Sequence, residues 1–148
     1  MTYRPFSVII TQASGAATAT RSNLSNNTGL TLAAFTPVKL NTSGQLELLD
    51  VSIETDALAF VGVTENAIPN SSDGSVISQG KLSNIGMFSF GDYVYVSKTS
   101  GLTNVLPSEG ISGFVAGDFI IRVGVIAKNE ANPLDKDLFI NSQIVGQI

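Results

Sequence analysis

The chain has 148 residues, of which 43% are hydrophobic and only 14% charged, and its formal net charge is −4. This balance excludes an intrinsically disordered protein and supplies enough apolar material for one domain with its own core. The eight lysines and arginines are spread singly along the sequence, whereas nucleic-acid binding needs clustered cations, so we expect no nucleic-acid partner. We expect no membrane partner either, because no apolar run approaches the ~20 residues of a membrane span.

Two residue types that carry much of protein chemistry, histidine and cysteine, are absent. Their absence removes nucleophile systems with an imidazole base and every zinc site built from these ligands. Acid–base catalysis would have to come from the 12 carboxylates, most of which lie in turns or beside glycine. We therefore expect a non-enzymatic protein with no catalytic residue, no cofactor and no metal. A carboxylate-dependent enzyme, such as a glycosidase, stays formally open.

The beginning of the chain, residues 1–31, is predicted to form an N-terminal strand and an extended arm. Residues 7–12 have the pattern of a short strand, and residues 13–31 are rich in Ala, Ser, Thr, Asn and Gly. Such a composition is typical of an extended or flexible segment. Two interpretations stay open, a flexible loop and an arm laid over a partner subunit. The β domain is expected to occupy residues 32–148.

Strand patterns dominate from residue 32 onward. Apolar and polar residues alternate on both sides of the turn Thr42-Ser43-Gly44, as in a hairpin whose glycine supplies a positive φ. The apolar run over 57–63 indicates a strand buried on both faces, and further short strands are predicted around 76–82.

The second half of the chain follows the same order. Residues 93–96 lead into the turn Ser100-Gly101, and a loop rich in Ser and Gly occupies 108–117. An apolar strand is predicted over 119–126, and a last strand near 137–142.

One pattern of residues therefore occurs twice, in 37–66 and in 93–129. Each copy has a strand, a Thr-Ser-Gly turn, a second strand and later an apolar strand interrupted by a glycine, Gly62 or Gly124. A glycine within a strand marks a bulge or a close approach of two backbones. The sequence thus predicts an all-β single domain of about nine short strands, sandwich-like or barrel-like, with two related halves.

An acidic turn near the end of the chain contains oxygen groups of the kind that calcium prefers. Glu130, Asn132, Asp135 and Asp137 lie within eight residues, with Lys136 among them. Their spacing matches no EF-hand loop. A solvated turn is therefore the favoured interpretation, and cation binding stays open.

A series of turn and strand motifs follows Arg21 in a definite order. The motifs are Asn26-Asn27-Thr28-Gly29, Thr36-Pro37-Val38-Lys39-Leu40, and residues 61–68, 80–84, 90–97, 101–103, 107 and 121–125. Their order resembles a widespread group of bacteriophage virion proteins, found among head-decoration, head-fibre and tail-fibre proteins. The resemblance covers about 128 of the 148 residues.

This resemblance implies a non-enzymatic, β-rich virion component at the particle surface, often assembled as a homotrimer. The implied partners are further copies of the chain and the major capsid protein or other virion proteins. The favoured function is a capsid decoration (cement) or head-fibre protein that binds the particle and stabilises it. The alternative is a tail-fibre or baseplate component that takes part in host attachment or glycan binding, through exposed aromatics such as Tyr93 and Tyr95. Alternation more simply places these two tyrosines on one face of a core strand, with their hydroxyls at its rim.

The segments outside the repeat supply the candidate assembly contacts. The C-terminal segment carries apolar residues to its last position, and such a terminus stays disordered unless the domain or a symmetric contact buries it. The N-terminal segment carries a comparable apolar set. We predict assembly contacts at Tyr3, Phe6, Val8, Ile10, Ile144, Val145 and Ile148.

Overall fold

The computed structural model describes residues 19–148, which contain nine β-strands and one short helix. The strands are β1 (Ala19–Asn26), β2 (Pro37–Leu40), β3 (Leu46–Leu48), β4 (Phe60–Thr64), β5 (Ser72–Leu82), β6 (Tyr93–Val96), β7 (Leu102–Thr103), β8 (Phe119–Lys128) and β9 (Lys136–Gln147), with the helix α2 (Glu54–Leu58) between β3 and β4. Their order in the sheet is β1-β3-β2-β4-β5-β9-β8-β6-β7, and a further β1–β5 pairing closes the first five strands into a barrel. The predicted all-β fold is therefore confirmed.

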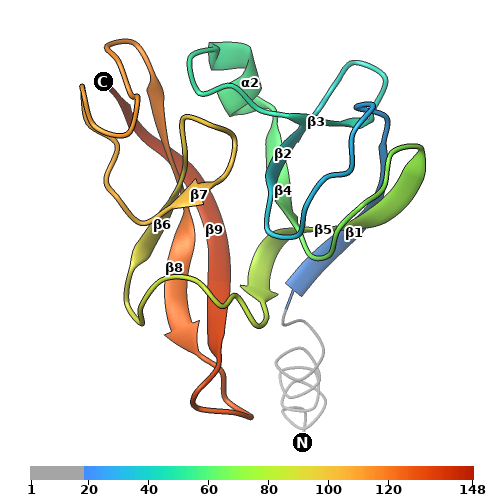
Figure 1. Cartoon of the computed structure of the whole chain (residues 1–148), viewed down its shortest axis with the longest axis vertical. Coiled ribbons are helices and arrows are strands. Elements are labelled where there is room, and N and C mark those ends of the chain that lie inside the picture. The colour runs from blue at the N-terminus through green and yellow to red at the C-terminus, as the bar shows by residue number, and fades with distance from the viewer. Residues whose placement is uncertain (1–18) are drawn as a thin grey trace, which may run out of the picture.

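Strand β5 joins the two halves of the sheet (Figure 1). One edge of β5 pairs with β1 along the whole of β1. The opposite edge pairs with β4 at Val76 and Ile77, and then with β9 over residues 80–82. We expected two or more short strands over this stretch, whereas one 11-residue strand serves both halves.

Strand β1 differs from the extended arm expected over residues 1–31, because residues 19–26 form a wall of the barrel. Its small polar residues contribute little apolar periodicity, and backbone pairing with β5 holds it instead. The fully buried Asn26 donates its side-chain N–H groups to the carbonyls of Leu30 and Ile68 at 2.7 and 2.8 Å. The strand expected at residues 7–12 lies outside the described residues.

The two copies of the repeat build the same local structure. β2 pairs with β4 at Val38↔Gly62, and β6 pairs with β8 at Val94↔Gly124. Directly beside each glycine, β4 and β8 carry one extra residue, a bulge at Val61 and at Val123. The common register agrees with the prediction of two related halves.

Each repeat glycine allows the next strand to pass unusually close. A Cβ at Gly62 would collide with the carbonyl of Ile77 on β5, and a Cβ at Gly124 would collide with the carbonyl of Phe139 on β9. The neighbouring backbone thus occupies the space of the missing side chain. This close approach is the reason that both apolar strands are interrupted by glycine.

The two hairpin turns have the same hydrogen bonds, but their Thr-Ser-Gly triplets occupy positions that differ by one residue. Backbone hydrogen bonds close the turns over residues 41–45 and 97–101. The residue with positive φ is Gly44 in the first turn and Ser100 in the second, so the two Thr-Ser-Gly triplets stand one position apart. A non-glycine residue rarely adopts this conformation. Here the Ser100 hydroxyl donates a hydrogen bond to the carbonyl of Leu49 at 3.0 Å, which ties the second hairpin to the first half.

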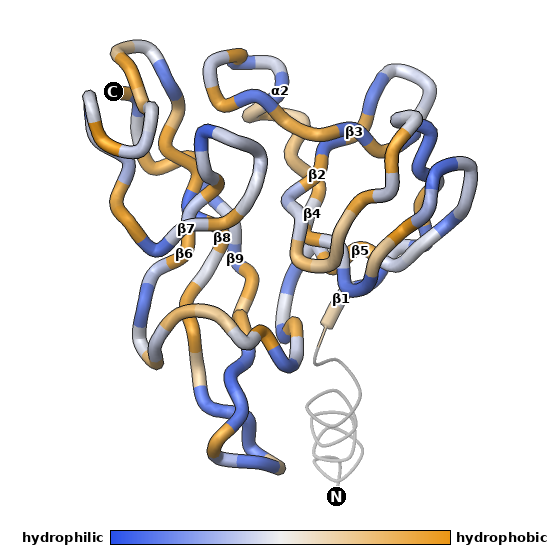
Figure 2. The backbone as a smooth tube through the Cα atoms, viewed as in Figure 1, coloured by the Kyte–Doolittle hydropathy of each residue, from blue (hydrophilic) through white to orange (hydrophobic). Residues whose placement is uncertain are grey.

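The apolar interior spans both halves. Figure 2 shows hydrophobic residues along the strands, whereas the β8–β9 connection is mostly hydrophilic. The larger cluster combines side chains from both halves, such as Leu49, Ile77 and Ile121, and the smaller cluster, with Val38 and Leu46, belongs to the barrel. The two halves therefore share the larger cluster.

Helix α2 replaces the first part of the strand predicted over residues 57–63. The helix ends at Leu58, and β4 begins at Phe60. Ala57 points into the core while Leu58 is 68% exposed. The apolar run therefore covers two elements, and only the second is a strand.

Replacement of Gly124 by alanine tests the close approach. The added methyl group meets backbone rather than a movable side chain, so we expect Gly124→Ala to destabilise the fold by about 3 kcal/mol or more. Gly86→Ala is the matched control, because no atom of the described residues lies within 4 Å of its Cβ position. Urea denaturation of both variants measures the difference, and equal stabilities would contradict the explanation.

An ion pair between Arg21 and Glu65 joins β1 to the barrel and makes the stability of the fold depend on pH. Arg21 donates to both oxygens of Glu65, at 3.1 Å from Nε and 2.9 Å from Nη2, and the Ser75 hydroxyl donates to Glu65 at 2.9 Å. The hydrogen bond from Arg21 is the main cause that holds the pKa of Glu65 below its ordinary value of 4.5. The ionised carboxylate therefore stabilises the folded state above that pH, and this contribution disappears as the pH falls through the lower folded-state pKa.

We expect Glu65→Gln to lower the free energy of unfolding at pH 7 by up to about 1 kcal/mol, since half of the Arg21 side chain is exposed. The difference from the parent protein should shrink below pH 4.5. Urea denaturation at pH 7 and pH 3 measures it, with the exposed Glu109→Gln as the control. A difference that is the same at both pH values would contradict this assignment.

Candidate functional site

The C-terminal half of β9 has an unpaired edge. Residues 141–147 pair with β8 on one side, and no other strand within residues 19–148 pairs with their second side. Such an edge presents a row of backbone N–H and C=O groups that can accept a further strand.

This free edge exists because β4 and β9 occupy successive parts of the same edge of β5. β9 pairs with β5 only up to Ile140, which faces Gly80. A few residues further along, β4 has taken the position beside Ile77. The rest of β9 must therefore diverge from the barrel.

A hollow of about 200 Å³ lies between the diverging elements. Its walls come from α2, β4, β8 and β9: Ala57, Leu58, Phe60, Ile121, Ser142, Gln143 and Ile144. The side chains of Leu58 and Ile144 are 68% and 40% exposed, so an apolar rim adjoins the free edge. We call this combination of hollow and edge the β9 cleft.

The predicted assembly contacts fall into three groups. Ile144 and Val145 are 40% and 44% exposed and lie next to each other on β9, so they project from its two faces. Ile148 instead packs against the core, and its backbone bonds to residues 117 and 118. The remaining four, Tyr3, Phe6, Val8 and Ile10, lie outside the described residues.

Two buried carboxylates occupy equivalent places in the two halves, each six residues before a repeat glycine. Asp56 accepts from Lys39 Nζ at 2.6 Å, and both oxygens of Asp118 accept from Lys98 Nζ at 2.8 and 2.9 Å. The two lysines come from different positions of their hairpins. The carboxylate position is thus common to both halves, while each half supplies its own cation.

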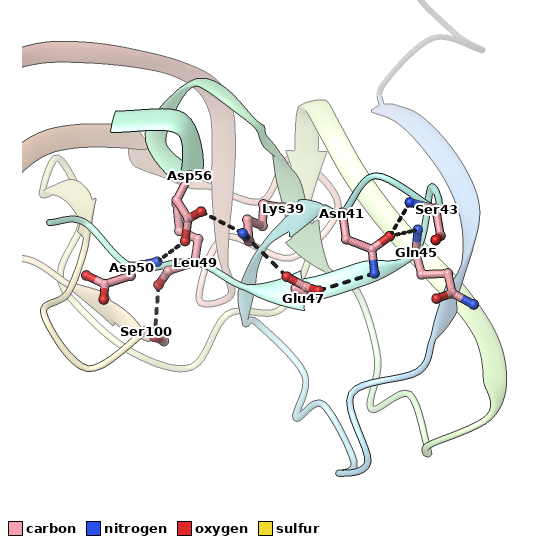
Figure 3. A network of polar contacts seen from close by, with 9 residues as sticks. All are labelled: Lys39, Asn41, Ser43, Gln45, Glu47, Leu49, Asp50, Asp56 and Ser100. Atoms are coloured by element: carbon pink, nitrogen blue, oxygen red, sulfur yellow. Dashed lines mark hydrogen bonds and ion pairs between the residues drawn. The ribbon is translucent and has the colours of Figure 1, made fainter. Parts of the chain in front are cut away.

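Figure 3 shows the first of these pairs within a larger polar network. Asp56 also accepts from the backbone N–H of Asp50 at 2.9 Å, and Lys39 lies 3.4 Å from Glu47. The hydrogen bond to Asp56 is the main cause that raises the pKa of Lys39. A lysine with a raised pKa stays protonated, so Lys39 is poorly suited to act as a base or nucleophile. We interpret the network as structural, because it links α2 to β2 and β3.

The acidic turn is held together by its own hydrogen bonds. The fully buried Asp137 accepts from Asn129 Nδ2 at 3.0 and 3.1 Å and lies 3.8 Å from Lys81 Nζ. Asp135 accepts from Asn132 at 3.0 Å. Within residues 19–148, no group of three or more acidic side chains is placed to hold a metal ion.

The two tyrosines of the glycan-binding alternative have different environments. Tyr93 is 55% exposed, whereas Tyr95 is only 9% exposed. Alternation places both on one face, but Tyr93 stands at the exposed start of β6, whereas the strand is buried from Val94 to Val96. Only Tyr93 remains available to a ligand.

No protein-family model matches this chain, and no curated protein matches its sequence. Among residues 19–148, no helix has the length and apolar character needed to cross a membrane. We therefore base its function on the described geometry and on the order of its motifs.

Sequence reasoning missed part of the β9 cleft. Leu58 and Phe60 were assigned to one buried strand, although they stand on different elements and line the hollow. The paired carboxylates were visible in principle, because Asp56 and Asp118 keep the same spacing to their glycines. Comparison of the two copies position by position would have found them.

The buried pair in the second half gives a testable prediction. Lys98→Met leaves the carboxylate of Asp118, 1% exposed, without its cation. We expect a loss of about 3 kcal/mol, the low end for a buried pair, because Lys98 keeps some contact with water. Thermal and urea denaturation measure it, with Lys128→Met at the exposed end of β8 as the control.

The double variant Lys98→Met with Asp118→Asn should be more stable than Lys98→Met alone, because it removes the uncompensated charge. A carboxamide can still accept the hydrogen bond that the backbone N–H of Val115 donates at 2.9 Å. If the double variant is the less stable of the two, the ion pair is not the source of the loss.

Proposed function

We propose that this protein is a non-enzymatic structural component of a bacteriophage virion, most simply a capsid decoration or head-fibre protein. It acts by surface complementarity with further copies of itself, as a homotrimer, and with the major capsid protein or other virion proteins. The observation that carries this proposal is the β9 cleft, an unpaired strand edge beside an apolar hollow. The order of motifs after Arg21 supports the same class of protein.

The chemistry of the β9 cleft suits the addition of an extended segment from a neighbouring protein. Main-chain hydrogen bonds to residues 141–147 would supply affinity, and the apolar rim with Leu58 and Ile144 would supply selectivity. A long, partly apolar edge is a liability in a protein that stays alone. A protein that assembles can use it.

The low charge of the surface favours the same function. Only 14% of residues are charged, and within the described residues the buried carboxylates Asp56, Asp118 and Asp137 each face a lysine. Weak net repulsion allows many copies to pack side by side. These carboxylates form ion pairs within the chain, so we assign the contacts with other proteins to the β9 cleft.

Location on the tail is the second candidate, and the exposed ring of Tyr93 favours it. The copy number in purified particles separates the two candidates. Hundreds of copies indicate the head, whereas about a dozen or fewer indicate the tail. Absence of the protein from purified particles would overturn both.

Charge placed on the free edge should block assembly. Ile144→Lys and Val145→Lys each place a charge on this strand, which opposes the addition of a further strand. We expect each variant to bind at least ten times more weakly to expanded capsids that lack the protein. Each variant should also lose self-association. Light scattering after gel filtration and co-sedimentation with capsids measure the two effects. Leu134→Lys, at a site 87% exposed in the β8–β9 turn, is the control. Assembly of the edge variants at the level of the parent protein would contradict the role of the cleft.

A further inference from the structure

The outer face of the second half carries a row of side chains that the β9 cleft does not use. Tyr93 on β6 faces Val125 on β8, and Val125 faces Phe139 on β9. Because neighbouring strands lie about 4.8 Å apart, the two aromatic residues stand roughly 10 Å apart across the sheet. Their side chains are 55% and 43% exposed. Two rings are thus held on rigid strands with an aliphatic residue between them.

A shallow hollow of about 350 Å³ accompanies this row. Its lining residues are Tyr93, Arg122, Gly124, Val125, Phe139 and Asn141. Gly124 contributes only backbone, which it must do because β9 passes where its side chain would be.

Polar groups border the hollow on the same strands. The guanidinium carbon of Arg122 lies 5.4 Å from the centre of the Tyr93 ring, a cation–π contact that fixes the side chain at the rim. Asn141 is exposed and offers a carboxamide with both donor and acceptor atoms. Among residues 19–148, no carboxylate lines the hollow.

From this arrangement we propose that the face of Tyr93, Arg122, Phe139 and Asn141 is a binding site for glycans built of pyranose rings. A sugar ring has apolar C–H faces and a rim of hydroxyl groups, which match exposed aromatic faces flanked by amide and guanidinium groups. The spacing of roughly 10 Å lets Tyr93 and Phe139 contact different rings of one chain. A carboxylate on the sugar would gain a further contact with Arg122.

Other ligand classes fit this face less well. A stable protein interface covers about 800 Å² on each partner, far more than three apolar side chains provide. A phosphate-rich ligand needs several cations, and within the described part of the chain Arg122 is the one cation that lines the hollow. The proposal does not depend on where the protein sits in a particle, since a glycan can be met on the head or on the tail.

Immobilised oligosaccharides test the proposal on the full chain. The panel contains neutral maltohexaose, cellohexaose and chitohexaose together with an oligogalacturonate, which reports the contribution of Arg122. We expect binding to at least one member, and Tyr93→Ala and Phe139→Ala should each weaken it tenfold or more. Tyr93→Leu keeps apolar bulk without a ring and should behave like Tyr93→Ala. Phe90→Ala is the control, because Phe90 is 48% exposed but does not line the hollow.

Three results would overturn the proposal. One is a lack of binding to every member of the panel at millimolar concentration. Another is binding that the Tyr93 and Phe139 variants leave unchanged while their thermal stability matches that of the parent protein. A third is loss of self-association, rather than of glycan binding, in these variants, which would make the face a contact between copies. The capsid and self-association assays on the edge variants stand apart from all three.

Discussion

Strand β5 is the constraint on which the rest of the structure depends, because its two edges hold three other strands. β1 covers one edge, and β4 and β9 divide the other between them. This division closes the first half into a barrel and forces β9 to diverge after Ile140. The opening beside α2 follows from the same division, so the proposed docking cleft results directly from the way the two halves share one strand.

The halves have diverged around a common framework. Both have the bulge beside the repeat glycine, the close contact of that glycine with a neighbouring carbonyl, and the buried aspartate six residues before it. They differ in the connection that leads to the glycine-containing strand. It contains the helix α2 before β4 in the first half, and it is a long loop before β8 in the second. The first half is also closed by β1, whereas the described residues of the second half form an open sheet. The candidate binding features all lie in or beside the open half.

The sequence predicted those strands whose position follows from alternation and from turn residues. Alternation and turn residues located both hairpins, and the repeated glycines predicted two related halves. β1 was missed because its polar residues are held by backbone pairing and by Asn26, and neither leaves an apolar periodicity. Tyr95 was offered as an exposed ring, whereas β6 is buried on both faces from Val94 to Val96, which alternation alone does not reveal. The cleft was beyond prediction, because Leu58 and Ile144 meet only through the competition of two strands for one edge of β5.

The sharing of β5 also has a consequence for the order in which the chain acquires its structure. All five barrel strands lie within residues 19–82, so every pairing of the barrel is available before β6 has been synthesised. The second half has no such independence, since β9 must add to a strand that already belongs to the first half. Synthesis from the N-terminus would therefore present the later strands with a finished template, and the exposed edge of β9 would emerge after the other eight described strands. Such an order shortens the time during which the free edge of β9 is exposed in an incompletely folded chain.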